Sequence, residues 1–403
     1  MLFKKSKHTY IHVDCDCFFA SCEVLRNPEL KGKKVCVWWE IIIACTYEAK
    51  ALGVKTGTPI WEAKVLLWKN THYFVPDHNY YSEVSDRLMK YLEYNTLSLE
   101  PFSIDEAFCD ITGLAEMNKM SLSKYIEKLQ TDIYNEIWIA VSIWVANTRI
   151  KAKIYSKVNK PYGICIGENN DQEVCLFKKL PLKDIPYIWK AYQKRLMYRC
   201  RTIYDYVWLG FRYIQKNMWK TGTDLWFELC WVNAFALKKG REPKSISRSR
   251  SFNKNITSDY NYLRKQLIHH FECVFEEITM KNYEVRQVTV MLRTKSFVTL
   301  TYDFTLLEYT NMRGELLDRV YDLFDRNYDR NEVYRSTGIV LSKFRSYLPR
   351  QMSIFDRPIR SKDNHYELTQ AMNFLNKKYG NHKVTFGLSM QWRGFDAKHS
   401  ITK

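Results

Sequence analysis

Hydrophobic and polar positions follow strand and helix spacings in turn through the first part of the chain. Residues 9–14 alternate in character, with Ile11 and Val13 on one side and Asp14 on the other, which predicts a half-buried strand. Apolar residues three and four apart predict helices over residues 18–25, 47–52, 80–92 and 124–137. Apolar runs predict further strands over residues 34–47, 107–111 and 139–145. This alternation favours an α+β or α/β core in the first 165 residues.

The pattern changes after this core. Residues 166–238 read as short helices without clear strands, and the basic, polar segment 238–244 marks a domain boundary. Beyond it, apolar residues from Leu263 to Ile278 predict an amphipathic helix. Alternation over 288–293 and a second run over 336–345 predict strands. The last block is therefore expected to be a small α/β sandwich.

Charge points to the class of partner. The 403 residues include 62 Lys and Arg against 44 Asp and Glu, a net charge of +18. This excess predicts a polyanionic partner, first of all nucleic acid, because Lys and Arg release its condensed counterions. An acidic membrane surface is the alternative, but there is no run of about 18 apolar residues to cross a bilayer. The 11 cysteines lack paired CxxC spacing, and the N-terminal residues lack a secretory signal's apolar core. We therefore expect a reduced, cytoplasmic protein.

Three acidic residues in two short motifs carry the candidate chemistry. Asp14 ends the first strand, and Asp105 and Glu106 directly precede another. A carboxylate beside an apolar run is costly unless it meets a cation or a partner, and Mg²⁺ prefers carboxylate oxygens as ligands. Two such ions about 3.5–4 Å apart activate an attacking hydroxyl and stabilise a leaving pyrophosphate. The pattern alone leaves open that these are ordinary surface acids near strand ends.

Four stretches, in matching order and spacing, resemble motifs of the Y-family translesion DNA polymerases. VDCDCFFASCE at 13–23 resembles the family's opening motif, and ACTYEAKALGV at 44–54 resembles its fingers motif. SIDEAF at 103–108 resembles the palm motif, and residues 146–161 resemble the palm–thumb border. The residues of these motifs most resemble those of the UmuC-like branch, which is similar to the catalytic subunit of DNA polymerase V.

The resemblance implies an α+β multidomain, right-hand polymerase with a mixed α/β palm, small fingers, a helical thumb and an α/β little finger. The implied parts are the palm at 1–20 and 75–165, the fingers at 21–74, the thumb with a helix-hairpin-helix-like turn at 166–238, the little finger at 245–350, and a clamp-binding peptide with a C-terminal extension at 351–403. The implied activity is template-directed, low-fidelity translesion DNA synthesis by two-metal nucleotidyl transfer, in DNA damage tolerance and the SOS response. A two-metal nuclease and a non-catalytic DNA-binding scaffold are the alternatives.

The same resemblance assigns roles to the residues of the opening and palm motifs. It implies that Asp14, Asp105 and Glu106 hold two Mg²⁺ ions, with the carbonyl of Cys15 as a further ligand. It also implies that Phe19 is the steric gate. A flat ring beneath the sugar leaves no room for the 2′-hydroxyl, the group that distinguishes a ribonucleotide.

Four further residues are implied to bind the incoming dNTP. Phe18 would pack beneath the nucleotide, and Tyr47, Lys50 and Lys160 would contact its phosphates. Many members of the family have Arg at the position of Lys50, and Lys supplies a point charge without the bidentate fork of Arg. Taken without the resemblance, Tyr47 and Lys50 read equally well as an ordinary helix face.

Two C-terminal segments carry the implied macromolecular contacts. Arg248 and Arg250, in the segment that opens the little finger, would follow the phosphates of primer–template DNA. Gln351, Ile354 and Phe355 resemble the peptide that docks bacterial polymerases on the sliding clamp, where apolar side chains fill a pocket. The tail beyond loosely resembles the extension of the UmuC-like branch, so a UmuD-like accessory protein is a further expected partner.

Tryptophan occurs where the family pattern has glycine. The chain has 14 Gly, about half the ordinary ~7 %, and 12 Trp. Trp38, Trp39, Trp144 and Trp189 all fall at glycine-like positions of the resemblance. We hypothesise that one codon, read here as Trp, is read as Gly in the source organism. Under the alternative these are genuine aromatic residues.

Overall fold

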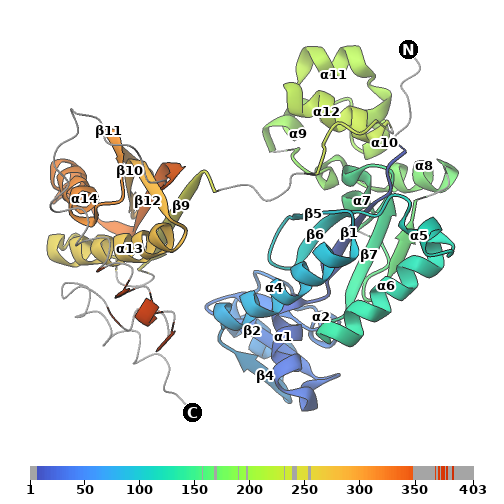
Figure 1. Cartoon of the computed structure of the whole chain (residues 1–403), viewed down its shortest axis with the longest axis horizontal. Helices are drawn as coiled ribbons and strands as arrows, with labels where there is room; N and C mark the ends of the chain where they lie inside the picture. Colours follow the sequence, from blue (N-terminus) through green and yellow to red (C-terminus); the bar gives the residue numbers. More distant parts are fainter. Residues whose placement is uncertain are drawn as a thin grey trace. The chain divides into compact units, whose positions relative to one another are not determined.

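The computed structural model describes residues 7–156, 158–167, 170–188, 190–196, 198–230, 232–237, 243–252 and 256–347, and separate positions between 368 and 384. The chain forms two compact units, Met1–Arg241 and Glu242–Lys403. Each unit has its own β-sheets and helices (Figure 1). Within the described residues no helix combines the length and apolar character needed to cross a bilayer.

The first unit is built on a five-stranded sheet with the order β5-β6-β1-β7-β8. Its central strand β1 pairs antiparallel with both β6 and β7, whereas β7 and β8 are parallel. The strands are β1 (Tyr10–Cys15), β5 (Ser98–Pro101), β6 (Glu106–Asp110), β7 (Val141–Ala146) and β8 (Ile164–Ile166). The N-terminal segment therefore lies in the middle of the sheet, between strands that follow much later in the sequence.

The two faces of this sheet differ in what covers them. On one face, Ile11 and Val13 belong to a core with apolar residues of α4 (His78–Asn95) and α6 (Leu122–Ile137). Because side chains alternate along a strand, His12 and Asp14 lie on the other face. The short helix α7 (Arg149–Tyr155) packs against β1 and β7. The alternation that predicted β1 thus also separates the core side chains from the polar ones.

A three-stranded sheet and a group of helices complete the first unit. The smaller sheet has the order β3-β2-β4, with β2 (Lys34–Trp38), β3 (Ile42–Cys45) and β4 (Thr71–Phe74). Its accompanying helices are α1 (Phe18–Arg26), α2 (Tyr47–Lys50) and α3 (Ile60–Leu67), and α5 (Leu114–Met117) lies between β6 and α6 in sequence. The helical group comprises α8 (Asn170–Lys179), α9 (Lys190–Leu196), α10 (Ile203–Trp208), α11 (Phe211–Asn217) and α12 (Lys220–Leu229).

A buried carboxylate joins the helical group to α7. Glu228 on α12 is fully buried and accepts hydrogen bonds from the backbone N–H groups of Ile150, Ala234 and Phe235. Thr148, just before α7, donates its hydroxyl to the carbonyl of the same glutamate at 3.0 Å. A buried acid with several backbone donors is held in one orientation, so these contacts fix α7 and the helical group together.

The second unit is a four-stranded antiparallel sheet with the order β11-β10-β12-β9. Its strands are β9 (Ser245–Ser251), β10 (Tyr283–Thr294), β11 (Thr299–Thr310) and β12 (Tyr334–Ser346). Helices α13 (Tyr260–Met280) and α14 (Arg313–Asn327) supply the apolar residues that pack on one side of the sheet. The expected α/β character of this block is confirmed.

Structure and sequence pattern differ most in this second unit. The amphipathic helix and the strands expected around 288–293 and 336–345 are present as α13, β10 and β12. Strand β9, strand β11 and helix α14 were not predicted. β9 has one buried residue, Ile246, and acquires its structure by pairing with β12. Tertiary pairing here overrides a weak local pattern.

The tryptophans occupy contrasting environments. Trp144 on β7 is fully buried, and its indole N–H donates to the carbonyl of Val158 at 2.8 Å. Trp38 is half-buried and Trp39 is 50 % exposed. Trp138 and Trp68 have positive φ angles of 66° and 47°. Trp189 lies outside the described residues.

Candidate active site

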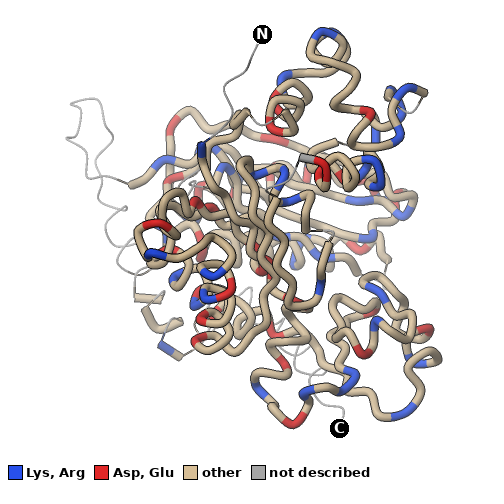
Figure 2. The backbone as a smooth tube through the Cα atoms, turned by 90° about the vertical axis from the view of Figure 1, so that its right-hand side faces the viewer, with Lys and Arg blue, Asp and Glu red and all other residues tan. Residues whose placement is uncertain are grey.

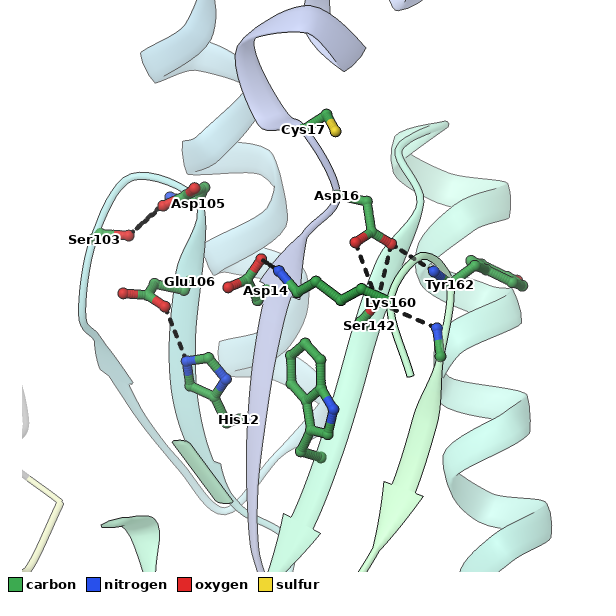
Figure 3. A network of polar contacts seen from close by, with 12 residues as sticks. His12, Asp14, Asp16, Cys17, Ser103, Asp105, Glu106, Ser142, Lys160 and Tyr162 are labelled. Carbon is green, nitrogen blue, oxygen red and sulfur yellow. Dashed lines mark hydrogen bonds and ion pairs between the residues drawn. The ribbon is translucent and has the colours of Figure 1, made fainter. Parts of the chain in front are cut away.

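Strand pairing brings the two acidic motifs together at one end of the five-stranded sheet. In the register of β1 and β6, Asp14 lies directly opposite Glu106. One residue further, the backbone N–H of Cys15 donates to the carbonyl of Asp105 at 2.8 Å. Directly opposed residues of an antiparallel pair point to the same face. Figure 3 shows Asp14, Asp105 and Glu106 at the ends of these neighbouring strands.

Two of the three predicted acids converge through their side chains. Asp14, Glu106 and His12 each offer one ligand atom, and these atoms all lie within 4.8 Å of one another. The carboxylate of Asp105 instead accepts a hydrogen bond from the hydroxyl of Ser103. The structure therefore brings Asp105 beside Asp14 through the backbone, while its side chain is engaged elsewhere (Figure 3).

Lysines neutralise both converging acids. The ammonium of Lys160 contacts Asp14 Oδ1 and that of Lys153 contacts Glu106 Oε2. Burial raises the pKa of Asp14 to about 6, against the lowering effect of Lys160. Burial acts in the same direction on Glu106, but hydrogen bonds from His12 and Lys153 together lower its pKa to about 2. The pKa of Glu106 is thus lower than that of Asp14 because Glu106 accepts more hydrogen bonds.

The residues present fit a divalent cation of the magnesium type. Asp14 and Glu106 provide hard carboxylate oxygens within the spacing of a shared ligand shell. Asp105 and Glu106 both raise the pKa of Asp14 through their negative charge. A bound cation relieves this repulsion. Lys160 and Lys153 supply compensating positive charge beside Asp14 and Glu106.

The predicted nucleotide-binding residues surround the start of α1 and α2. Phe18 is buried, and the half-buried ring of Phe19 stacks on Tyr81 with centroids 4.5 Å apart. Tyr47 donates its hydroxyl to Asp16 at 3.1 Å. Lys50 places its ammonium 3.1 Å from the sulfur of Cys17, next to Phe18 in the chain.

Asp16 is an internal anchor of this region. It accepts hydrogen bonds from the hydroxyls of Tyr47 and Ser142 and from the backbone N–H of Tyr162, the last at 2.7 Å. Its side chain is turned away from Asp14 in Figure 3. With these donors satisfied, Asp16 ties α2 and the 160–163 segment to the end of β1.

Sequence reasoning missed two residues of the site. His12 is fully buried with Nε2 3.1 Å from Glu106 Oε2, and Lys153 reaches the same oxygen from α7. The signal for His12 was present, because it precedes Asp14 by two residues on a strand and so shares its face. No comparable signal marked Lys153, since it stands in a helix among other basic residues.

Comparison with known proteins places this site in a family. Residues 13–157 match the impB/mucB/samB family, and residues 243–354 match the C-terminal domain of the same family. Together the two matches cover more than half of the chain and include Asp14, Asp105 and Glu106. The chain belongs to the Y-family DNA polymerases. It is accordingly a DNA-directed DNA polymerase of the translesion type, and its fold is that of a right-hand polymerase with mixed α/β domains.

Relatives of this Y-family polymerase carry a consistent name. It is 27 % identical over 366 residues to DNA polymerase IV of Staphylococcus epidermidis, with 86 % of this chain and 98 % of the relative covered. It is 26 % identical over 355 residues to DNA polymerase IV of Staphylococcus aureus JH9, with the same coverage. These names do not single out the UmuC-like branch suggested by the motif wording.

Solved structures support the polymerase fold. A Y-family polymerase chimera of Dbh and Dpo4 matches with a TM-score of 0.69 at 23 % identity, covering 84 % of this chain and 100 % of the chimera. An insertion ternary complex of Dbh DNA polymerase matches with a TM-score of 0.58 at the same identity and coverage. At this identity the likeness concerns the fold.

The polymerase's second unit holds the predicted DNA-binding arginines on the edge strand β9. In the register with β12, Arg248 lies opposite Ile339 and Arg250 opposite Thr337. Both partners are buried on the side of the sheet that the helices cover, so the arginines project toward that side at the edge. The open side of β9 carries serines instead, among them Ser249. The clamp-peptide residues Gln351, Ile354 and Phe355 lie outside the described residues.

Proposed function

We propose that this polymerase performs low-fidelity synthesis past damaged template bases by two-metal nucleotidyl transfer at Asp14, Asp105 and Glu106. The observation that carries the proposal is the β1–β6 register, which sets Asp14 opposite Glu106 and joins Cys15 to Asp105. The acidic motifs lie about ninety residues apart in sequence, and this pairing supports a common catalytic role.

The proposed cofactor is a pair of Mg²⁺ ions. Asp14, Glu106 and Asp105 would hold the ions, and the carbonyl of Cys15 would be a further ligand. To do so, Asp105 would give up its hydrogen bond from Ser103. When bound, such ions lower the pKa of the primer 3′-hydroxyl and neutralise the triphosphate. The carboxylates orient both reacting groups, and the buried surroundings of Asp14 strengthen these charge interactions.

The remaining residues of the site are proposed to bind and select the dNTP. Lys160 would exchange its contact with Asp14 for a phosphate oxygen, and Lys50 and Tyr47 would bind the same triphosphate. Phe19 would exclude ribonucleotides, because its ring is held in place by stacking on Tyr81. Phe18, buried at the start of α1, would support the nucleotide from beneath.

Each domain of the proposed right-hand polymerase corresponds to its own part of the chain. The palm comprises 1–20 and 75–165, the fingers 21–74, the thumb 166–238 and the little finger 245–350. Primer–template DNA would contact the little finger at Arg248 and Arg250, beside a sheet face rich in serine and threonine hydroxyls. Hydroxyl and guanidinium groups both bind phosphate oxygens without reading sequence.

Further partners and setting are proposed from the motif wording alone. Gln351, Ile354 and Phe355 would dock on a sliding clamp in the cytoplasm, within an SOS-type damage response. The UmuC-like assignment predicts that a UmuD-like protein stimulates synthesis. Extension by the isolated chain at full rate, unchanged by such a partner, contradicts the UmuC-like assignment.

A primer-extension gel tests the proposal. With labelled primer, template, Mg²⁺ and dNTPs, the wild-type chain should lengthen the primer, and Asp105→Asn should abolish extension while DNA binding survives. Glu116→Gln, which alters an exposed carboxylate of the same unit, is the matched control and should extend normally. Shortening of the primer identifies a two-metal nuclease. Unaltered extension by Asp105→Asn refutes the assignment of the acids, and an absence of any product from wild type leaves the scaffold alternative.

A further inference from the structure

His12 is a buried polar ring in the wall of the candidate active site. It lies on β1 with 0 % exposure, between the rings of Phe108 and Trp144, whose centroids are 4.9 Å and 5.6 Å away. A side chain buried among aromatic rings is ordinarily apolar, because an imidazole loses hydrogen bonds to water there. In the strand register His12 lies opposite Phe108 and Trp144, and its Nε2 reaches Glu106, two residues before Phe108 on β6.

His12 and Lys153 both contact the same oxygen of Glu106. His12 Nε2 lies 3.1 Å from Glu106 Oε2, and the ammonium of Lys153 contacts that oxygen while lying 3.3 Å from His12 Nε2. Among the described residues no partner accompanies Oε1 of Glu106. Figure 3 shows one oxygen of this carboxylate directed at His12 and the other directed away from it.

The contacts determine how the imidazole is protonated. A carboxylate only accepts hydrogen bonds, so the ring nitrogen that meets Glu106 Oε2, Nε2, carries a proton. The Lys153 ammonium then donates to Glu106 and not to the ring, because both groups are donors at that point. Nδ1 of His12 has no hydrogen-bond partner among the described residues.

We propose that His12 is a positioning residue for Glu106: together with Lys153 it fixes Oε2 and so holds the carboxylate in the orientation in which it binds the catalytic cation. The inference rests on the proposed two-metal function. A carboxylate held through one oxygen has a restricted side-chain rotation, and groups that orient a metal ligand in this way commonly change metal affinity or activity about 10–100-fold when removed. His12 acts through Glu106 and does not itself touch the substrate.

The opposing possibility is that His12 binds the cation directly. One ring nitrogen of His12 is within 4.8 Å of a carboxylate oxygen of Asp14 and one of Glu106. Direct ligation requires that the Nε2 proton be lost and that the contact with Glu106 be broken. The hydrogen bond between His12 and Glu106 and the presence of the Lys153 cation at the same point favour positioning over ligation.

The test uses the full chain with Mn²⁺ alone, followed by electron paramagnetic resonance. His12→Phe retains a ring between Phe108 and Trp144 but removes the donor, and should weaken Mn²⁺ binding about tenfold. His12→Gln places an amide N–H near the same point and should restore most of the affinity. His270→Leu, which alters a buried histidine of the second unit, is the matched control and should bind Mn²⁺ as wild type does.

Parallel measurements separate this inference from the proposed function. Primer extension by His12→Phe should need about tenfold more Mg²⁺ for half-maximal rate, with DNA affinity unchanged. Equal Mn²⁺ affinity in wild type and His12→Phe overturns the positioning role, as does a ¹⁴N hyperfine coupling that disappears in His12→Phe. Failure of wild type to extend primers counts against the proposed function and leaves the Mn²⁺ comparison intact. If His12→Phe does not fold, His12→Leu provides the same comparison.

Discussion

Asp14 and Asp16 stand two residues apart in one motif yet have opposite electrostatic environments. Asp14 is surrounded by other acids and buried, and its pKa rises to about 6. Asp16 accepts hydrogen bonds from the hydroxyls of Tyr47 and Ser142 and from the backbone N–H of Tyr162, which satisfy its buried carboxylate. The charge of Asp14 therefore favours cation binding but lowers the stability of the fold, whereas Asp16 contributes to that stability.

This difference predicts opposite effects of two similar substitutions. The folded-state pKa of Asp14 lies above its usual value of 3.8, so charged Asp14 destabilises the metal-free protein above about pH 6. That cost disappears below about pH 4, where the folded and unfolded states are both protonated. Asp14→Asn should therefore raise the free energy of unfolding by about 1–3 kcal/mol at pH 7.5, with a smaller gain toward pH 4.

Chemical denaturation of the metal-free protein between pH 4 and 8 measures this effect. Asp16→Asn is the comparison and should lose about 1–3 kcal/mol, because a buried donor set loses its acceptor charge. The reasoning is wrong if both variants lose stability to the same extent at pH 7.5.

At the residue scale the sequence predicted the acidic residues of the site but not the residues that hydrogen-bond to them. Asp14 and Glu106 were found because acid beside an apolar strand is unusual, and because the surrounding motifs resemble a known family. His12 belongs to the same alternating strand, but a single histidine carries no chemical signal without a partner. The turn of Asp105 toward Ser103 depends on a local hydrogen bond that no residue pattern specifies.

At the scale of elements, two helices end on tryptophan in a conformation that favours glycine. Trp138 ends α6 with φ 66° and ψ 22°, and Trp68 ends α3 with φ 47° and ψ −121°. Both side chains are largely exposed, at 66 % and 77 %. A left-handed residue after a helix is usually Gly, because a Cβ is strained there. These positions strengthen the hypothesis that glycine is the natural residue, on grounds independent of the family pattern.

Substitution at the end of α6 tests this strain. Trp138→Gly should raise the free energy of unfolding by about 0.5–1 kcal/mol, because relief of the left-handed strain exceeds the entropy cost of glycine. Trp138→Ala keeps the Cβ and should give no such gain. Trp144→Gly should instead lose about 3–5 kcal/mol, because the buried indole leaves a cavity. Thermal denaturation compares the three variants, and a loss of stability in Trp138→Gly contradicts the argument.

Peptide mass spectrometry of the protein from its natural source determines the residue itself. Glycine at 138 and 68 is expected. Tryptophan at position 144 of the natural protein rejects the hypothesis of a reassigned codon.

Helices and strands were predictable where one face is buried and the other is exposed to solvent. β1, α6 and β10 show such periodicity and were found from it. β9 has Ile246 as its single buried residue, so its pattern resembles a polar loop. Helix α14 was missed although its buried Leu316, Val320 and Phe324 recur every fourth residue, a signal present in the sequence.

For the whole molecule, positive charge is the dominant property. Figure 2 shows Lys and Arg at many places along the backbone, interspersed with Asp and Glu. The net charge of +18 therefore arises from many sites and not from one basic segment. Binding of DNA through such a surface depends strongly on salt, because each phosphate contact releases condensed counterions.

Salt dependence predicts the contribution of the β9 arginines. The double substitution Arg248→Gln with Arg250→Gln should weaken primer–template binding and reduce the slope of log K against log salt concentration by about 1–2. Lys281→Gln, which alters an exposed lysine already paired with Glu277, is the control and should leave the slope nearly unchanged. Fluorescence anisotropy from about 50 to 200 mM salt measures both. An unaltered slope in the double variant removes these arginines from the DNA contact.

The central position of β1 has a consequence for biosynthesis. Tyr10–Cys15 leaves the ribosome before its neighbours β6 and β7, which begin only at Glu106 and Val141. At a translation rate of about 5–20 residues per second, this apolar segment waits roughly 5–25 s for its second neighbour. An unpaired apolar strand can add to another nascent chain. Chaperone supply and elongation speed should therefore govern the yield of active enzyme more than the stability of the finished protein does.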